Sequence, residues 1–135
     1  AGDLAGRRFA LWGLSFKPHT DDIREAPALD LIRSLLDAGA SVAAFDPAAA
    51  ANVRKALGDN PAVQYVQERY EALRDADALV LVTEWPAFRK PDFDRMKTLL
   101  KQPVIFDGRN QYDPAQLRRQ GFTLYTMGRG RHGQT

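Results

Sequence analysis

Lys17 stands in the stretch GLSFKPHTDDIREAP (13–27), where it follows Phe16. A lysine ammonium is a compact positive charge that suits a phosphate group. Pro18 disfavours helical geometry at the residue before it, so Lys17 is held in extended backbone. Phe16 beside it can pack against a sugar or a base, and the alternative is an exposed Lys17 next to a core Phe16. This pair makes the segment a candidate site for a phosphorylated ligand.

Arg109 is the second candidate cation, and it follows Gly108 in DGRN. A guanidinium can hold a phosphate or a ribose through paired donors. Gly108, which has no side chain, lets backbone approach a ligand closely. A surface salt bridge is the alternative role for Arg109.

Arg24 is the third candidate, because a cation near a helix N-terminus is mildly unfavourable unless something offsets it. The neighbouring carboxylates of Asp21, Asp22 and Glu25 can do so, and they are also suited to capping the helix. An anionic ligand would be the other compensation. The residue types leave both readings of Arg24 open.

Other side chains give weaker signals. Trp85, Phe88 and Arg89 either line a cleft or, for the aromatics, close the end of the core. His19 and His132 are isolated and have no metal-ligand spacing or nucleophile partner. We therefore expect no metal site, catalytic triad or paired-carboxylate site.

Asp46 ends an apolar stretch, as does the ribose-binding acid of a dinucleotide fold. However, the sequence has only Gly13 where the fingerprint G-x-G-x-x-G would stand. Asp46 also lies well beyond the roughly 20 residues that the fingerprint allows. We therefore interpret Asp46 as a turn cap and expect no primary NAD site here.

Helices and strands must hold these residues in place. The apolar pattern of the chain predicts alternating strands and helices. Glycines and prolines bound most of the helices, as Pro27 and Gly39 bound the first. The predicted strands are 7–13, 41–46, 63–66, 78–83, 103–108 and 122–128. The predicted helices are 26–39, 47–58, 69–76, 92–100 and 114–121.

Apolar strands that alternate with helices predict an α/β, Rossmann-like, doubly wound parallel sheet of about six strands in one three-layer domain. In the usual order 3-2-1-4-5-6, the first, fourth and fifth strands are neighbours. The loops after these three strands carry Lys17, Trp85 and Arg109. We expect the loops to converge at the carboxyl edge of the sheet, where such folds bind ligands.

Composition sets further bounds. The 135 residues suit one domain, which we place at 1–128, with 129–135 as a flexible tail. The chain has no cysteine, so it has no disulfide, thiolate metal site or cysteine nucleophile, and it fits a cytoplasmic protein. Its net charge of +2 without an aromatic-interleaved basic stripe gives no indication of nucleic-acid binding. No apolar run reaches the roughly 20 residues of a membrane span, and the polar N-terminus predicts no secretory signal. The chain lacks an initiator Met, so we expect it to be part of a larger protein.

Four motifs in this order, GLSFKPHTDDIREAPALDLI, FDP, TEWPAFRKPDFDRMK and PVIFDGRNQYDP, carry a resemblance to a known family. Residues 4–128 closely resemble the C-terminal domain of the UDP-glucose/GDP-mannose dehydrogenases. The TEW…FR and DGRN segments look most like the UDP-glucose branch.

The resemblance implies a domain that binds a UDP-sugar and is not catalytic alone. The family oxidises the C6 hydroxyl of a nucleotide sugar to a carboxylate with two NAD, and likeness to the UDP-glucose branch implies the oxidation of UDP-glucose to UDP-glucuronate. Its N-terminal domain holds the primary NAD site, its central region holds a catalytic cysteine and dimer contacts, and the full-length protein is a homo-oligomer. By motif match, Phe16 and Lys17 would contact the UDP-sugar, Arg109 its nucleotide part, and Arg24 would reach towards NAD.

Three alternatives remain open. The domain could belong to a dehydrogenase of another UDP-sugar, such as UDP-N-acetylmannosamine. It could be a free-standing nucleotide-binding module, or a protein-interaction domain on the same fold.

Overall fold

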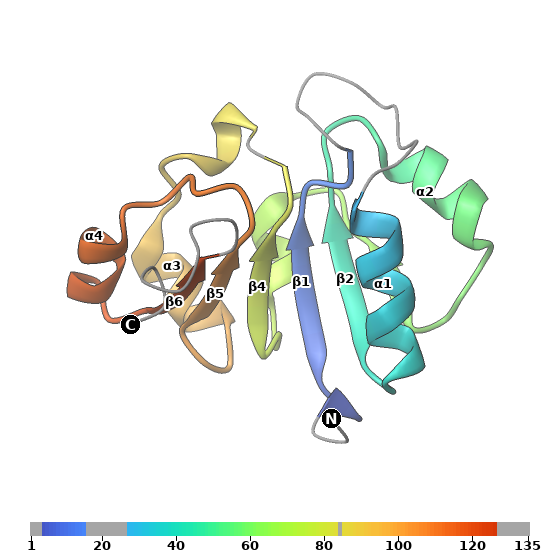
Figure 1. Ribbon diagram of the computed structural model, residues 1–135, viewed down its shortest axis with the longest axis horizontal. Helices are drawn as coiled ribbons and strands as arrows, with labels where there is room; N and C mark the ends of the chain where they lie inside the picture. Colours follow the sequence, from blue (N-terminus) through green and yellow to red (C-terminus); the bar gives the residue numbers. More distant parts are fainter. Residues whose placement is uncertain (1–3, 16–26, 84, 127–135) are drawn as a thin grey trace.

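The computed structural model describes residues 4–15, 27–83 and 85–126, which form a parallel sheet with helices on both faces (Figure 1). The strands are β1 (Arg8–Trp12), β2 (Ser41–Phe45), β3 (Val63–Tyr65), β4 (Ala78–Leu81), β5 (Val104–Asp107) and β6 (Thr123–Thr126). The α-helices are α1 (Pro27–Asp37), α2 (Ala50–Leu57), α3 (Phe93–Leu99) and α4 (Pro114–Arg119). Two short 3₁₀ helices, η2 (Arg69–Leu73) and η3 (Pro86–Phe88), complete the described elements.

The six strands lie in the order β3-β2-β1-β4-β5-β6, and every neighbouring pair is parallel. This confirms the predicted doubly wound sheet. Trp12, at the end of β1, pairs with Phe45 on one side and with Leu81 on the other. The carboxyl ends of β1, β2 and β4 therefore lie side by side, at the top of Figure 1.

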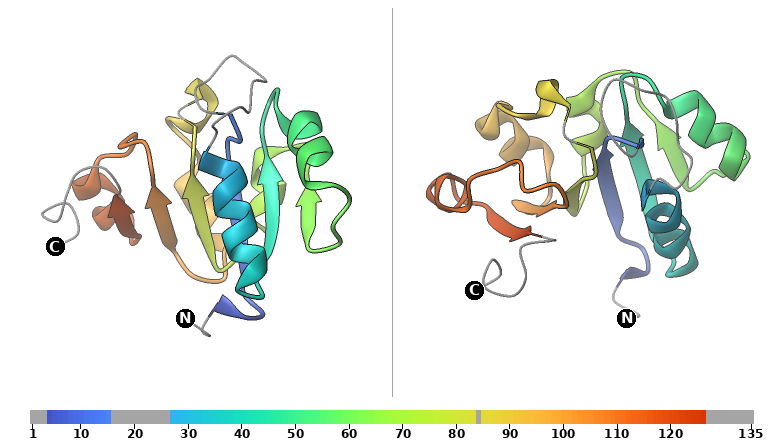
Figure 2. Two further views of the ribbon diagram at one scale, coloured as in Figure 1. Left: turned by 45° about the vertical axis from the view of Figure 1, so that its right-hand side comes forward. Right: turned by 45° about the horizontal axis from the view of Figure 1, so that its top comes forward.

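Alternate residues of the strands divide the core into two layers. On one face, Ile32 and Leu35 of α1 and Val53 of α2 pack over β1, β2 and β3. On the other face, Met96 of α3 and Leu117 of α4 pack over β4, β5 and β6, together with η2 and η3. Figure 2 shows the two sets of helices on opposite sides of the sheet. Side chains that are buried on both faces explain why the strands read as continuous apolar runs.

Two predicted helices differ from the structure. The segment expected as a helix over 69–76 forms only the five-residue η2, which ends where Arg74 turns extended to lead into β4. The helix expected from Pro47 begins at Ala50 instead. The cause is Asp46, whose Oδ1 accepts from the backbone N–H groups of Ala48 and Ala49 at 2.7 Å and holds a turn ahead of α2.

The last predicted strand is observed up to Thr126, and the boundary at residue 128 lies outside the described residues. In the described part of the chain, no helix has the length and apolar character needed to cross a membrane.

Candidate functional site

The end of β1 is fixed by hydrogen bonds from both neighbouring strands. Gly13 donates its N–H to the carbonyl of Phe45 at 2.9 Å. Leu14 donates its N–H to Oδ2 of Asp46 at 2.6 Å, and the hydroxyl of Thr83 donates to the carbonyl of Ser15 at 2.6 Å. The chain is therefore held at three successive residues immediately before the Phe16–Lys17 segment.

Glycine is required at position 13 by its backbone conformation and by the closeness of Thr83. Its φ of 94° lies in the left-handed region, which side chains with L chirality rarely adopt. A Cβ on Gly13 would lie 2.6 Å from the backbone nitrogen of Thr83 and overlap the Thr83 side chain. Gly13 thus permits the close approach of the chain segments that follow β1 and β4.

Asp46 is 7% exposed, and both its carboxylate oxygens are occupied. Oδ2 accepts from Leu14, while Oδ1 accepts from Ala48 and Ala49. The interpretation of Asp46 as a cap is confirmed, because its oxygens hold protein backbone and do not face a ribose. The N–H of Leu14, which follows the glycine turn, is also taken by Asp46 and is not available to a ligand.

The loop after β5 is organised by Asp107, which is fully buried. Its Oδ1 accepts from the N–H of Arg109 at 2.9 Å, and its Oδ2 accepts from the N–H of Tyr112 at 2.8 Å. Gly108 donates to the carbonyl of Leu81 at 3.0 Å, which ties this loop to the end of β4. Asn110 has a φ of 57°, so the chain turns sharply directly after Arg109. The half-buried Arg109 is thereby held at the carboxyl edge of the sheet.

Tyr112 joins the loops that follow β4 and β5. Its hydroxyl donates to the carbonyl of Phe88 at 2.6 Å, and the side-chain amide of Gln111 donates to the carbonyl of Trp85 at 3.3 Å. Burial raises the pKa of Tyr112 far above its usual range, and the nearby carboxylate of Asp107 adds to this rise. The phenol is therefore neutral at physiological pH and serves as a fixed hydrogen-bond donor.

The aromatic residues after β4 close the end of the core. Phe88 is fully buried and stacks on Trp12, with ring centroids 4.9 Å apart. Trp85 belongs to the same apolar cluster and is 9% exposed. Arg89 differs from both, since it is exposed. The core reading of Trp85 and Phe88 is confirmed.

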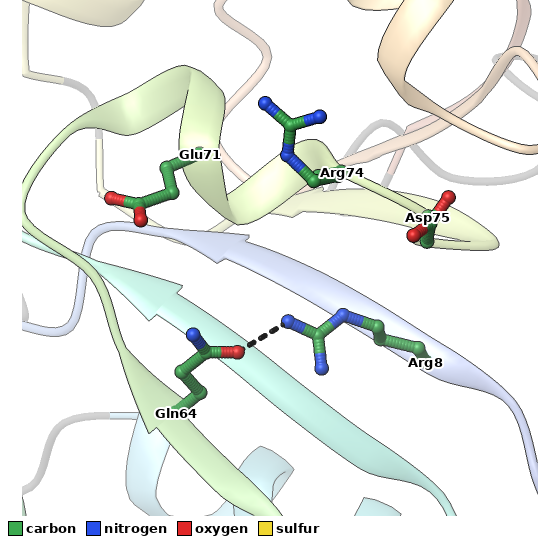
Figure 3. A pocket seen from close by; sticks show the side chains of 5 residues that line it. All are labelled: Arg8, Gln64, Glu71, Arg74 and Asp75. Carbon is green, nitrogen blue, oxygen red and sulfur yellow. Dashed lines mark hydrogen bonds between the residues drawn. The ribbon is translucent and has the colours of Figure 1, made fainter.

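Two surface hollows have different positions relative to this edge. One groove of about 510 Å³ lies between the loops after β4 and β5 and is lined by Arg89, Lys90, Phe93, Gln111, Tyr112 and Asp113, among others. A second hollow of about 360 Å³ involves Arg8, Gln64, Glu71, Arg74 and Asp75 (Figure 3). There, Arg8 donates to Oε1 of Gln64 at 2.7 Å. Because Arg8 begins β1 and Asp75 precedes β4, this second hollow lies towards the amino ends of the strands, away from the expected ligand edge.

The structure places only part of the predicted site. Arg109 lies at the carboxyl edge, at the end of a strand that neighbours β4. Phe16, Lys17 and Arg24 lie outside the described residues, so their roles stay predictions. The same holds for His19 and His132, and for the acidic residues Asp21, Asp22 and Glu25. Within the described ranges, no group of His, Cys, Asp or Glu side chains could hold a metal ion.

Three supporting residues were not singled out from the sequence, namely Thr83, Asp107 and Tyr112. The sequence held a signal for Asp107, since an acid between an apolar strand and a glycine is suited to accept from the following backbone. It held none for Thr83, whose partner Ser15 lies 68 residues away.

A comparison with protein families identifies the family of this chain. The model of the UDP-glucose/GDP-mannose dehydrogenase family, UDP binding domain, matches residues 10–114. The match extends from β1 to the start of α4 and includes all three loops at the carboxyl edge.

Known proteins give the same result. A UDP-glucose 6-dehydrogenase of Pseudomonas aeruginosa is 46% identical, over 98% of this chain and 30% of that protein. One of Rhizobium meliloti is 42% identical, over 95% of this chain and 29% of its own length. The solved structure of a UDP-glucose dehydrogenase from the archaeon Pyrobaculum islandicum matches with a TM-score of 0.71 at 31% identity, over 92% of this chain and 25% of that chain. The present chain thus spans less than a third of these relatives, and it belongs to the UDP-glucose/GDP-mannose dehydrogenase family as a UDP-binding domain.

Proposed function

We propose that this chain is the C-terminal substrate-binding domain of a UDP-glucose 6-dehydrogenase, an NAD-dependent enzyme that oxidises UDP-glucose to UDP-glucuronate. The observation that carries the proposal is the alignment of nearly the whole chain with curated UDP-glucose 6-dehydrogenases at 46% and 42% identity. In the longer protein, this domain supplies UDP contacts. We further propose that the longer protein is cytoplasmic and homo-oligomeric.

We assign the contacts to the carboxyl edge of the sheet. Phe16 and Lys17 would hold the UDP-sugar, and Arg109 would hold its nucleotide part. The hydrogen bonds of Asp46 and Thr83 just before Phe16, and those of Asp107 at Arg109, support this assignment. They fix the backbone at both ends of the proposed contact, so that less entropy is lost when the ligand binds.

NAD would accept the electrons of the oxidised C6 carbon in the longer protein. At the described start of the first loop, Asp46 occupies the N–H of Leu14 and Thr83 fills the space beside Gly13, which does not suit a cofactor pyrophosphate. We therefore assign the primary NAD site to the part of the enzyme that lies outside this chain. Arg24 would reach towards that cofactor from this domain.

The chain contains no cysteine, so the proposed catalytic cysteine must lie elsewhere in the longer protein. The test is a spectrophotometric assay of NADH formation by that longer protein with UDP-glucose, UDP-N-acetylmannosamine and GDP-mannose. We expect two NADH per UDP-glucose and much slower turnover of the other two sugars. Turnover of UDP-N-acetylmannosamine without turnover of UDP-glucose would assign the domain to the alternative substrate.

The 135-residue chain alone is expected to form no NADH with any of these sugars, because it lacks a cysteine nucleophile. NADH formation by this chain above a blank would refute its non-catalytic role. Titration of the longer protein with UDP by calorimetry separates nucleotide binding from a pure interaction domain, for which no heat of binding is expected.

A further inference from the structure

In the part of the chain that the structure describes, one face of the sheet is left partly uncovered at its β5–β6 end. Val104 and Phe106 of β5 pair with Thr123 and Tyr125 of β6, and all four side chains share this face by strand alternation. Tyr125 is 43% exposed, and its ring stacks on that of Phe106 with centroids 4.9 Å apart. We call Val104, Phe106 and Tyr125 the β5–β6 patch.

The rest of the sheet is covered more fully. On the same face, Ile32 of α1 and Val53 of α2 are fully buried against β1, β2 and β3. On the opposite face of β5 and β6, Ile105 is fully buried beneath α3 and α4. Figures 1 and 2 show no described helix over β5 and β6 on the face of the sheet that α1 covers.

Parallel sheets occur almost always with both faces covered, usually by helices. The half-buried Val104 and Phe106 and the exposed Tyr125 depart from this rule within the described residues. The patch therefore calls for an apolar element that packs against it.

We propose that the β5–β6 patch is covered in the longer protein by a segment of the same polypeptide that lies outside this chain, through the apolar face of a helix. The relatives have room for such a segment, because this chain spans only about 30% of their length. The patch faces away from α3 and α4, and it is separate from the loop after β5, which carries Arg109. The proposal therefore stands independently of the substrate.

The size of the patch favours a segment of the same polypeptide over a second copy. A stable interface buries about 800 Å² per partner. Phe106 and Tyr125 bury at most about 250 Å² each, so the patch falls short of that area even with the smaller Val104. A tethered segment needs less area, because its effective concentration is on the order of millimolar.

Site-specific thiol labelling tests the proposal, since this chain has no cysteine of its own. In the longer protein, Tyr125→Cys is labelled with a maleimide, and the peptide that contains position 125 is quantified by mass spectrometry. Arg118→Cys, at an exposed site of α4, is the matched control. Labelling at position 125 is expected to be at least tenfold slower in the native than in the urea-unfolded protein, while position 118 shows a much smaller difference.

Equal labelling rates at position 125 in the native and unfolded states would overturn the proposal. Thr123→Cys, which is exposed on the same face, replaces Tyr125→Cys if that variant does not fold. Protection that disappears on dilution would instead indicate a second copy. Protection that disappears when residues 127–135 are deleted would indicate cover from within this chain, and either outcome contradicts the assignment.

Discussion

The hydroxyl of Thr83 donates a 2.6 Å hydrogen bond to the carbonyl of Ser15, and this contact joins the loops that leave β4 and β1. Thr83 is fully buried, and its side chain fills the space beside Gly13. Because Ser15 directly precedes Phe16 and Lys17, the start of the proposed substrate-binding segment is held in place by the neighbouring strand.

Thr83→Val is expected to lower the free energy of unfolding by about 1 kcal/mol, because it removes one buried hydrogen bond and keeps the shape of the side chain. In the longer enzyme, it should raise the KM for UDP-glucose more than it lowers kcat. Thr83→Ser keeps the hydroxyl and is the control for the hydrogen bond. Urea unfolding and steady-state kinetics check both effects, and a wild-type KM in Thr83→Val would show that this anchor does not matter for substrate binding.

Gly13→Ala and Gly58→Ala separate steric overlap from backbone strain. Both glycines have positive φ, but a Cβ on Gly58 would meet nothing within 4 Å. Gly58→Ala should therefore cost only backbone strain of about 1–3 kcal/mol, because a φ of 74° with a ψ of 177° is adopted almost only by glycine. Gly13→Ala should cost about 1–3 kcal/mol more, because its Cβ would overlap Thr83. Equal unfolding free energies for the two variants in urea would argue against the close approach of Gly13 and Thr83 at the ends of β1 and β4.

Asp46→Asn should destabilise the fold by about 2 kcal/mol, since three backbone N–H groups lose a charged acceptor. The asparagine amide cannot accept all three hydrogen bonds, because its NH₂ group is a donor and would face a backbone N–H. The matched control is Asp37→Asn, at an exposed position at the end of α1, where little change is expected. Thermal unfolding measures both variants, and an unchanged melting temperature in Asp46→Asn would contradict the capping role.

Tyr112→Phe tests the junction between the β4 and β5 loops. At neutral pH, the variant should lose about 1 kcal/mol of stability, because the hydrogen bond to the carbonyl of Phe88 is absent. The pKa of Tyr112 is raised in the folded state above its unfolded value of about 10. The contribution of its neutral phenol is thus fully present below pH 10 and is lost as the pH rises further.

The stability difference between wild type and Tyr112→Phe should therefore narrow above pH 10. Urea unfolding of both proteins between neutral pH and pH 11 measures this difference. A constant difference over the whole range would mean that Tyr112 ionises alike in the folded and unfolded states.

The strand order could be predicted because the alternation of strands and helices is visible in local sequence patterns. Apolar strands such as 78–83 and bounded helices such as 114–121 repeat along the chain, and parallel connections leave few topologies. The convergence of the loops after β1, β4 and β5 followed from that order alone. The cap of α4 is a local feature of the same kind, since the carboxylate of Asp113 accepts from the N–H of Ala115 two residues on.

The hydrogen bonds that hold the site in place could not be predicted, because they depend on the register between strands that are distant in the sequence. Nothing near Thr83 in the sequence indicates Ser15, and nothing near Tyr112 indicates the carbonyl of Phe88. Asp46 was predicted as a local cap, but its second bond, to Leu14, arises only when β1 and β2 pair. The sequence thus indicated Arg109 and the edge on which it lies, while the fold supplied the residues that hold that edge together, and the places of Lys17 and Arg24 stay predictions.

The most direct test of the central claim is the dissociation constant of UDP from the longer protein, measured by titration calorimetry without NAD. Each charged hydrogen bond contributes about 1.5–3 kcal/mol, so Lys17→Ala and Arg109→Ala should each weaken binding by about ten- to hundredfold. Arg118→Ala, which removes an exposed cation from α4, should bind UDP like the wild type. Wild-type affinity in both Lys17→Ala and Arg109→Ala would contradict the claim that this edge of the sheet holds the nucleotide.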